Sequence, residues 1–394
     1  MALIKKVDIN LDYLTPNRSF IYPLWSESGE KVLEARVLLT KEKIQDIRKK
    51  FGNMLHYRDT GKGQPIPAFR LKIAYKQSKE ILNEVERTQK FSKTSFRDTE
   101  KVIEEIVNDL NSNEFEFIQL LKDLKSHDDY LYTHAVNVGV LTAVFSKLLG
   151  NFTPEEIKYF TLGAFLLDIG EMKIDRQLLN KEGKFNISDM QKMKRHPQLG
   201  YEMLKEISGI HPIVLQTLLF HHEKYNNRGY YNMPYENLPI PPKLVSICDV
   251  YDALTTARPF REAISPARTL KILFNLSGNQ FDFGLVHGFI NKMGPMLNNT
   301  QSFYARNDIL ALNTEELAMV KDFGIVDSLR PKVIVFCKFE RHNNRLSVRF
   351  YDRPIEIDLQ QDGTRSIAKF INNDGQVNAI MSKLHERQFL TESH

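Results

Sequence analysis

The sequence predicts a mainly α-helical protein, in which a central helical bundle lies between a small α+β N-terminal domain and a short β-rich C-terminal extension. Three observations lead to this fold class. Apolar residues recur at helical spacing through the middle of the chain. The first ~65 residues instead alternate short β-type runs with one helix. After Pro295, short apolar runs are separated by turns that contain Asn and Gly.

The α+β N-terminal domain is expected over residues 1–70. Its single helix is predicted for TKEKIQDIRKKFG, because a threonine stands at the capping position, the apolar residues follow a helical period and a glycine closes the segment. The predicted strands are SFIYPLW, KVLEARVLL and LHYRD. A helical linker is expected next, over residues 71–126. Its apolar positions at helical spacing include Val102, Ile103, Ile106, Val107 and Leu110.

The central bundle is expected over residues 127–294 and the β-rich extension over residues 295–394. The predicted helices of the bundle are AVNVGVLTAVFSKLLG, PEEIKYFTLGAFLLDIG, SDMQKMKRHPQLGYEMLKEI, HPIVLQTLLFHHE, KLVSICDVYDALTTA and PARTLKILFNLSG. The predicted strands of the extension are DILALNTEEL, KVIVFCKF, RLSVRFYD and IEIDL.

Composition limits the classes of partner and the compartment. The net charge of +5 on 394 residues suits an anionic small molecule and gives no reason to expect a nucleic-acid polymer. The two cysteines, Cys248 and Cys337, lie far apart, which favours a reducing compartment over a disulfide framework. No apolar run approaches the ~18 residues that span a bilayer, and the N-terminus lacks the apolar core of a signal peptide. We therefore expect a cytoplasmic protein that does not enter the membrane.

Histidines and aspartates recur on the central helices at a spacing that suggests a metal site. The candidate ligands are His134, Asp168, His196, His221, His222 and Asp249. Apart from the adjacent pair, successive candidates lie 25 to 34 residues apart, so each helix with its loop can bring one ligand to a common point. Imidazole and carboxylate bind Fe, Mn, Zn and related divalent ions. Six such groups exceed what one tetrahedral ion needs and suit two metals.

The alternative for each residue alone is an ordinary core or surface position. A single histidine on an apolar helix is more often a core residue than a ligand, and His211 has no place in the pattern. The pair His221–His222 is more informative, because adjacent helical positions point ~100° apart. Both can reach one cluster only near a helix end, which FHHEKYNNRGYY is expected to supply. Asp249 stands within an apolar helix, where a buried carboxylate needs a partner.

Taken together and in order, these motifs resemble the HD-GYP domain, a branch of the HD-superfamily of metal-dependent phosphohydrolases. The resemblance covers about residues 127–294. The strings that carry it are HDDYLYTHAVNVGVL, LLDIGEMKIDRQLLNKEGKF, RHPQLGYEML, HHEKYNNRGYY and ICDVYDALTTARPFREA.

The resemblance implies an HD-type helical bundle that hydrolyses cyclic di-GMP to pGpG or onward to GMP. It assigns His134, Asp168 and Asp249 to one metal ion. It assigns a second ion to His196, His221 and His222, with Asp168 bridging the two. Asp168 and Glu171 would act in catalysis. The residues that would bind the substrate are Arg258, Arg261, Gly229 and Tyr230. The two arginines suit this role because guanidinium groups pair well with phosphate oxygens.

The sequence also departs from the family pattern. Leu167 replaces the histidine of the HD pair, so the site around His134 is expected to be weak or empty. Glu171 replaces a lysine that lies near the substrate phosphate in the family, and Tyr231 replaces the proline of GYP. Tyr130 stands where some members have a glutamate that supports a third metal, so at most two divalent ions (Fe, Mn or similar) are expected.

Two outcomes remain open from the sequence. In the first, the Glu171 carboxylate takes the place of the missing imidazole, directly or through water, and the protein is a phosphodiesterase with weakened activity. In the second, the domain is a degenerate effector that binds cyclic di-GMP or a signalling protein without hydrolysis. A second copy of the chain is the remaining partner considered, as in a homodimer.

Overall fold

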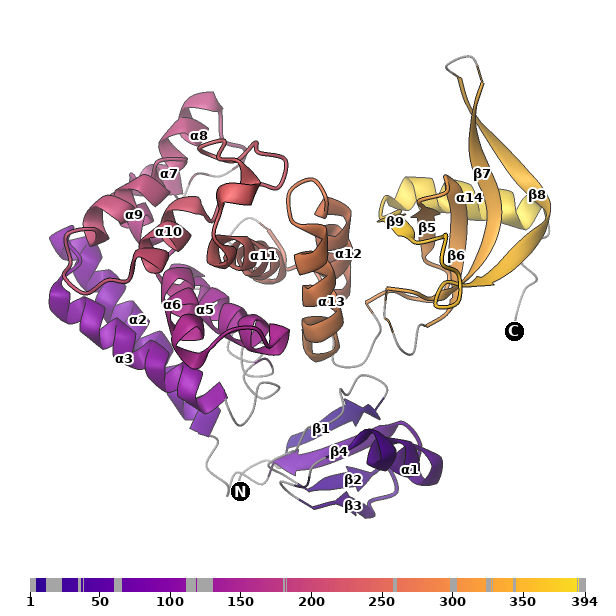
Figure 1. The fold of residues 1–394 in the computed structure, drawn as a ribbon, viewed down its shortest axis with the longest axis horizontal. Coiled ribbons are helices and arrows are strands. Elements are labelled where there is room, and N and C mark those ends of the chain that lie inside the picture. The colour runs from indigo at the N-terminus through magenta and orange to yellow at the C-terminus, as the bar shows by residue number, and fades with distance from the viewer. Residues whose placement is uncertain are drawn as a thin grey trace. The chain divides into compact units, whose positions relative to one another are not determined.

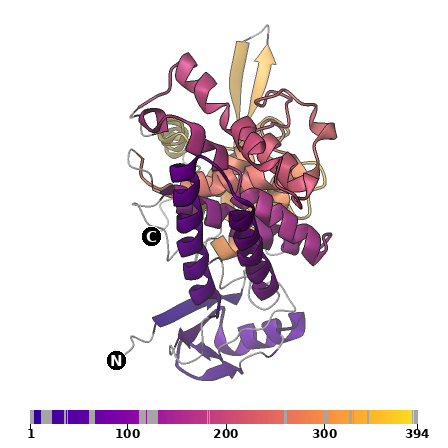
Figure 2. The same ribbon diagram turned by 90° about the vertical axis from the view of Figure 1, so that its left-hand side faces the viewer.

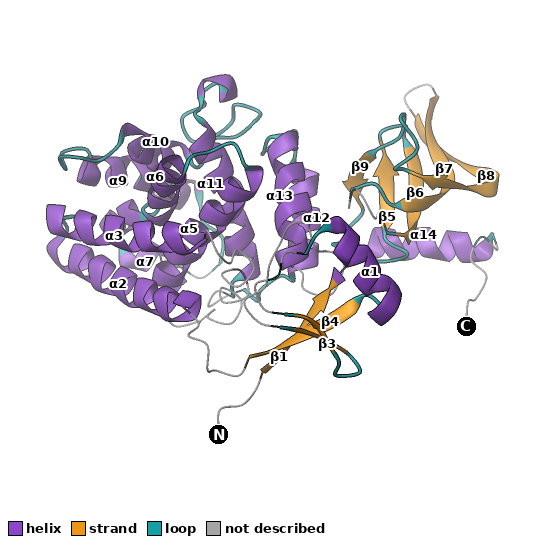
Figure 3. Cartoon of the chain, turned by 60° about the horizontal axis from the view of Figure 1, so that its bottom comes forward, coloured by secondary structure: helices purple, strands orange, loops and turns teal. Residues whose placement is uncertain are grey.

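The computed structural model describes most of the chain and divides it into two compact units. The described residues are 5–11, 23–34, 37, 39–59, 66–110, 118, 130–179, 181, 183–257, 261–297, 303–323, 327, 329–342, 345–387 and 389. One unit comprises residues 1–265 and 278–285, and the other comprises residues 266–277 and 286–394. The protein is mainly α-helical with two small sheets, which confirms the predicted fold class (Figures 1 and 3). The predicted four-part division into domains stays a prediction.

The N-terminal sheet is antiparallel, with the strand order β1-β4-β2-β3. Its strands are β1 (Lys5–Asn10), β2 (Leu24–Ser26), β3 (Lys31–Leu33) and β4 (Met54–Asp59). Helix α1 (Lys41–Phe51) begins after Thr40, whose hydroxyl accepts a bond from the Lys43 backbone, and ends at Gly52 with a φ of 79°. The predicted cap and closing glycine are therefore confirmed. Buried apolar residues of α1 and the strands form one core: Leu11, Leu24, Leu39, Ile44, Ile47 and Leu55.

Helices α2 (Ile66–Thr88) and α3 (Lys93–Leu110) cover most of the described part of the predicted linker and lie side by side (Figures 1 and 2). The apolar positions predicted on one face of this segment are buried, as the helical spacing required: Val102, Ile103, Ile106, Val107 and Leu110. Helix α2 also packs against α5 (Tyr130–Leu149) and against the short 3-10 helix η2 (Ile169–Lys173). The linker is thus a packed part of the helical unit.

The central helices surround the candidate ligands. Their remaining members are α6 (Pro154–Phe165), α7 (Arg176–Leu179), α8 (Ile187–Met193), α9 (His196–Leu204), α10 (Pro212–Phe220), η3 (Tyr235–Asn237) and α11 (Ile240–Thr255). Helix α6 starts with a capping box, in which Thr153 and Glu156 bond each other's backbone N–H. The prediction of one helix for SDMQKMKRHPQLGYEMLKEI is wrong, because two helices, α8 and α9, form there with a turn between them. Pro197 in the first turn of α9 starts a new helix there, since proline cannot donate a backbone bond within one.

The second unit combines helices with a five-stranded antiparallel sheet of order β8-β7-β6-β5-β9. Its elements are α12 (Pro266–Leu276), most of α13 (Phe283–Leu297), β5 (Ile309–Leu312), β6 (Glu316–Asp322), β7 (Lys332–His342), β8 (Arg345–Asp358), β9 (Ile367–Phe370) and α14 (Asp374–Glu386). The sequence did not predict α14, whose apolar face covers the sheet through Leu384. Among the described residues, no helix is long and apolar enough to cross a membrane.

Candidate metal centre

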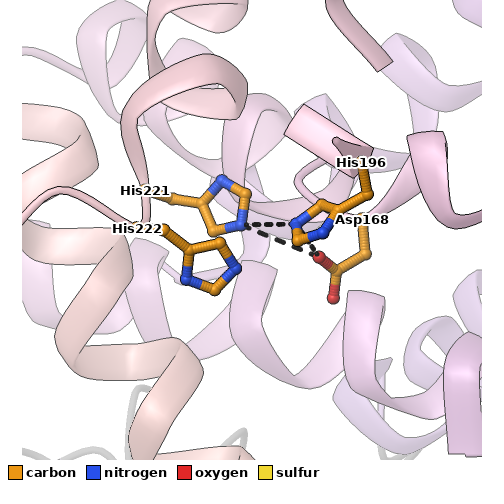
Figure 4. A group of neighbouring side chains, drawn as sticks. All are labelled: Asp168, His196, His221 and His222. Carbon is orange, nitrogen blue, oxygen red and sulfur yellow. Dashed lines mark hydrogen bonds and ion pairs between the residues drawn. The ribbon is translucent and has the colours of Figure 1, made fainter. Parts of the chain in front are cut away.

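Three central segments bring the four candidate ligands of one group together (Figure 4). Asp168 lies in the turn between α6 and η2, and His196 is the first residue of α9. Helix α10 ends at Phe220, so His221 and His222 follow its last turn, as the sequence predicted. One ligand atom from each of these four residues lies within 4.8 Å of the other three, and the group could hold a metal ion.

This arrangement requires a glycine at position 170, where there is no room for a Cβ atom. A Cβ placed on Gly170 would lie 1.9 Å from the carbonyl oxygen of His196 and 2.5 Å from the backbone nitrogen of Gly200. The backbones of η2 and α9 therefore approach more closely than any side chain would permit. This contact brings Asp168, at the start of η2, to His196, at the start of α9.

Two of the three distances within the group match those between atoms that share one ion, and the distance from Asp168 to His221 is longer. The Nε2 atoms of His196 and His221 lie 3.3 Å apart. Oδ1 of Asp168 lies 3.3 Å from Nε2 of His196 and 3.7 Å from Nε2 of His221. With metal–ligand bonds of about 2.1 Å, two ligand atoms of one ion lie about 3.0–3.4 Å apart.

The protonation of the imidazoles supports a cation at this point. Nδ1 of His196 lies 2.9 Å from the carbonyl oxygen of Met193, and Nδ1 of His221 lies 2.7 Å from that of Leu218. A carbonyl oxygen only accepts, so each Nδ1 carries the ring proton and each Nε2 presents a lone pair. Two lone pairs and a carboxylate oxygen then converge without a proton among them, which a cation satisfies.

Burial keeps these rings neutral. His196 and His221 are almost fully enclosed and His222 is partly buried, and burial lowers the pKa of His196 against a smaller raising effect from the charge of Glu171. Burial lowers the pKa of His221 well below its usual value and that of His222 to about 4. Neutral imidazoles are the form that binds metal. About a quarter of the Asp168 side chain stays exposed, so the group remains accessible from solvent.

A second set of ligand candidates faces the other oxygen of Asp168. Nε2 of His134, in the first turns of α5, lies 3.6 Å from Oδ2 of Asp168 and 3.1 Å from Oδ1 of Asp249 on α11. Burial raises the pKa of Asp249, but the facing imidazoles of His134, His222 and His221 lower it by more. The net pKa lies below the usual value, and the carboxylate stays ionised. The two oxygens of Asp168 thus point to two different sets of side chains, the arrangement of a carboxylate that bridges two ions.

Asp252 supports the ring of His134, and the sequence analysis missed it. Its Oδ2 accepts a bond of 2.8 Å from Nδ1 of His134, while its Oδ1 accepts bonds from Asn137 at 2.8 Å and Thr256 at 3.1 Å. A carboxylate behind the ring directs the Nε2 lone pair forward and makes it more basic. Asp252 follows Asp249 by three residues and Asn137 follows His134 by three. This shared helical spacing is the signal that could have revealed both residues.

The loop that contains Gly229 and Tyr230 covers the histidine side. The ring of Tyr230 lies 4.4 Å from that of His222, centroid to centroid. Burial raises the pKa of Tyr230 to about 12, with further raising from the charges of Asp168, Asp249 and Glu171, so the phenol keeps its proton beside the centre. The buried carboxylate of Glu223 anchors the loop, because it accepts the backbone N–H groups of Tyr231 at 2.7 Å and Met233 at 2.9 Å.

Comparisons with known proteins find similarity over the central part of the chain. A family model for the HD domain matches residues 118–285. The cyclic di-GMP phosphodiesterase PA4108 of Pseudomonas aeruginosa is 28% identical over 54% of this chain and 49% of its own length. The cyclic di-GMP phosphodiesterase response regulator RpfG of Xanthomonas campestris pv. campestris is 31% identical over 45% of this chain and 47% of its own length.

Residues 118–285 thus match the HD domain family, and the chain is similar in sequence to these two phosphodiesterases. It spans about half the length of these two relatives. The fold is also similar to a solved structure, Bd1817, a HDG"Y"P protein from Bdellovibrio bacteriovorus. That match covers 74% of this chain and all of the other, with a TM-score of 0.50 and 17% identity.

Two of the departures from the HD-GYP pattern, Leu167 and Glu171, lie next to the bridging candidate. Leu167 has only 1% of its surface exposed, and it places an apolar side chain where the pattern has an imidazole. Glu171 lies on η2, where its backbone N–H bonds the carbonyl oxygen of Asp168 at 2.9 Å. Residues three apart in a 3-10 helix share a side, and the charge of Glu171 acts on both His196 and Tyr230. Glu171 is therefore near the centre, although it is outside the four-residue group.

The remaining predicted site residues of the HD-GYP domain are less fully described. Arg258 and the side chain of Tyr130 lie outside the described residues. Arg261 is described, and its guanidinium donates to the carbonyl oxygen of Ala253 near the end of α11. A Cβ on Gly229 would lie 2.5 Å from the Cα of Glu223, so glycine is required for the loop to pack on its anchor. The substrate-binding roles predicted for these residues stay predictions.

Proposed function

We propose that this protein is a metal-dependent phosphodiesterase that hydrolyses cyclic di-GMP to pGpG or GMP. The observation that carries the proposal is the orientation of Asp168, whose Oδ1 faces His196 and His221 while its Oδ2 faces His134. A carboxylate between two groups of imidazoles suits two divalent ions a short distance apart. The names of the relatives PA4108 and RpfG support cyclic di-GMP as the substrate.

The proposed ligand sets follow from these contacts. His196, His221 and His222 would hold one ion, His134 and Asp249 would hold the other, and Asp168 would bridge them. When bound, divalent ions such as Fe or Mn would supply positive charge opposite the phosphodiester and increase the acidity of the attacking water. Hydrolysis forms a new P–O bond from water and breaks the P–O3′ bond, and the 3′ oxygen takes a proton.

The other residues near the centre have proposed roles in binding and proton transfer. Tyr230 keeps its phenolic proton and can donate a hydrogen bond to a substrate oxygen beside His222. Arg258 and Arg261 would pair with phosphate oxygens. Glu171 would take the place of the imidazole absent at Leu167, directly or through water, and would hold water near the His134 side. Its negative charge also opposes a dianionic substrate, so weakened activity is expected.

Leu167 favours a second candidate function. The buried leucine leaves the His134 side with one protein ligand fewer than the family pattern. If that side holds no ion, the domain would bind cyclic di-GMP or a protein partner, which could be a second copy of the chain, and would signal without hydrolysis. Both functions involve binding of cyclic di-GMP, but only the first includes its hydrolysis.

Turnover distinguishes the two functions. Purified protein is incubated with cyclic di-GMP and either Mn(II) or anaerobic Fe(II), and pGpG and GMP are separated by chromatography. The enzyme proposal expects product in the wild type and none in His221→Ala. If the wild type forms no more product than His221→Ala, the enzyme proposal is wrong. Calorimetric binding of cyclic di-GMP without turnover would then establish the effector, and a protein that neither binds nor hydrolyses it would exclude both.

A further inference from the structure

A chain of hydrogen bonds extends from His134 to helix α2. His134 donates from Nδ1 to Asp252, as described above, and Nδ2 of Asn137 donates to Oδ1 of the same carboxylate at 2.8 Å. The phenolic hydroxyl of Tyr75, on α2, donates to Oδ1 of Asn137. The amide of Asn137 therefore has its oxygen occupied by Tyr75 and its nitrogen by Asp252. The bond from Tyr75 fixes which way the amide faces.

The polar groups in the middle of this chain of hydrogen bonds are buried. Asn137 and Asp252 are each 1% exposed, so neither can exchange its partner for bulk water without opening the bundle. Burial and the charge of Asp252 raise the pKa of Tyr75, so the phenol remains a hydrogen-bond donor. Without the Asn137 donor, Oδ1 of Asp252 would keep only the longer bond from Thr256, and the carboxylate would be held less firmly. The ring of His134 would move with it.

Helix α2 lies outside residues 118–285, the part of the chain that the HD family model matches. It nevertheless contacts both ligand-bearing segments of the centre. Tyr75 reaches α5 and its His134, as above. At the other end of the helix, Nε2 of Gln89 donates to the carbonyl oxygen of Met172 in η2 at 3.1 Å, and Glu86 pairs with Arg176 of α7. A movement of α2 would therefore disturb both sides of Asp168.

We propose that Tyr75 is a positioning residue for the His134 side of the metal centre, acting through Asn137 and Asp252. This inference rests on the proposed two-metal function. It adds a residue that influences metal affinity and lies outside residues 118–285, which the HD family model matches. Tyr75 holds the Asn137 amide, Asn137 holds the Asp252 carboxylate, and Asp252 aims the Nε2 lone pair of His134 at Asp168 and Asp249. The position of α2 thus sets the metal affinity of the side that already lacks an imidazole at Leu167.

The test measures metal affinity at each side separately, in the full chain and without substrate. Metal-free protein is titrated with Co(II), and binding is followed by calorimetry and by the visible absorption of the ion. The His134→Ala and His196→Ala variants assign the two binding steps, since each removes a ligand of one side. Tyr75→Phe deletes only the hydroxyl that bonds Asn137. Tyr159→Phe is the matched control, because its hydroxyl bonds the exposed Glu155 on the same helix.

We expect Tyr75→Phe to weaken the His134-side step by about threefold to tenfold and to leave the His196-side step unchanged. Asp252→Asn should weaken the same step by about 10–100-fold. Tyr159→Phe should change neither step. A purely structural role for Tyr75 would lower the melting temperature of the metal-free protein and affect both steps alike.

Two results would overturn the inference. One is a Tyr75→Phe protein with wild-type affinity at the His134 side, and the other is an equal loss at both sides. The failure of the proposed function is recognised separately, because a wild-type protein that binds no Co(II) contradicts the two-metal centre itself. Absence of hydrolysis does not affect the titration, which requires no turnover.

Discussion

The Nε2 atoms of His196 and His221 face each other at 3.3 Å, and neither carries a proton. Each ring donates its Nδ1–H to a backbone carbonyl oxygen, and burial lowers the pKa of both. Lone pairs at this separation repel unless a positive charge lies among them. Asp168 adds a carboxylate oxygen to the same point. A divalent ion at this point would relieve that repulsion.

Removal of metal should consequently destabilise the protein. At a free concentration of Mn(II) 100 times its dissociation constant, binding adds about 2.7 kcal/mol to the free energy of unfolding, which corresponds to a rise of roughly 5–10 °C in Tm. Thermal unfolding with EDTA and with Mn(II) measures this difference. His221→Ala should lose most of the metal-dependent rise. His385→Ala, in the exposed part of α14, should retain all of it, and a rise that is equal in both variants would place the ion elsewhere.

The sequence predicted the candidate ligands more completely than the residues that hold them in place. His221 and His222 were placed at a helix end from the adjacent spacing, and α10 does end at Phe220. The candidates were also expected to converge, which the contacts of Asp168 with His134, His196 and His221 confirm. Periodicity suffices here because each ligand stands near the end of a helix or within one apolar face.

The hydrogen bonds that hold the candidate ligands in place depend on long-range contacts, which the sequence does not reveal. The bond between Tyr75 and Asn137 joins residues that are 62 positions apart, on helices whose packing no local pattern fixes. The break between α8 and α9 was missed because the apolar period continues across Lys194 and Arg195, although Pro197 opposes a continuous helix.

Gly170→Ala should separate the two backbones that bring Asp168 to His196. The added Cβ would lie 1.9 Å from the carbonyl oxygen of His196, so η2 and α9 must move apart. We expect a loss of about 1–3 kcal/mol in the free energy of unfolding and much weaker metal binding. The control is Gly139→Ala on α5, where the new Cβ meets no atom closer than 3.7 Å and alanine favours the helix. If Gly170→Ala bound metal like Gly139→Ala, the close approach would not position the ligands.

Glu223→Ala should loosen the loop around Tyr230. The substitution leaves the part-buried backbone N–H groups of Tyr231 and Met233 without their acceptor, at a cost of about 0.5–1.5 kcal/mol for each lost bond. The loop should become sensitive to limited proteolysis, and affinity for cyclic di-GMP should fall in calorimetry. Glu223→Gln keeps one acceptor oxygen and should give an intermediate effect. Glu236→Ala, at an exposed position of η3, should change neither measurement, and a similar loss there would mean that the assay reports general instability.

Leu167→His should strengthen the weaker side of the centre. The variant places an imidazole next to Asp168 in the turn after α6, where the HD-GYP pattern has one. We expect about tenfold higher affinity for Mn(II) at the His134 side, because a neutral imidazole adds a ligand. Metal-free Leu167→His should be less stable than the wild type by about 1–3 kcal/mol, since a polar ring replaces a buried leucine.

The matched variant is Leu166→His, one residue earlier and equally buried, at the end of α6. It should lose the same stability without any gain in metal affinity, because adjacent positions direct their side chains differently. Turnover of cyclic di-GMP measured in both variants then decides what the leucine does. A rise in turnover with Leu167→His alone would show that the missing ligand limits activity. Stronger metal binding without turnover would instead assign the limit to Glu171, whose charge beside the centre the substitution does not remove.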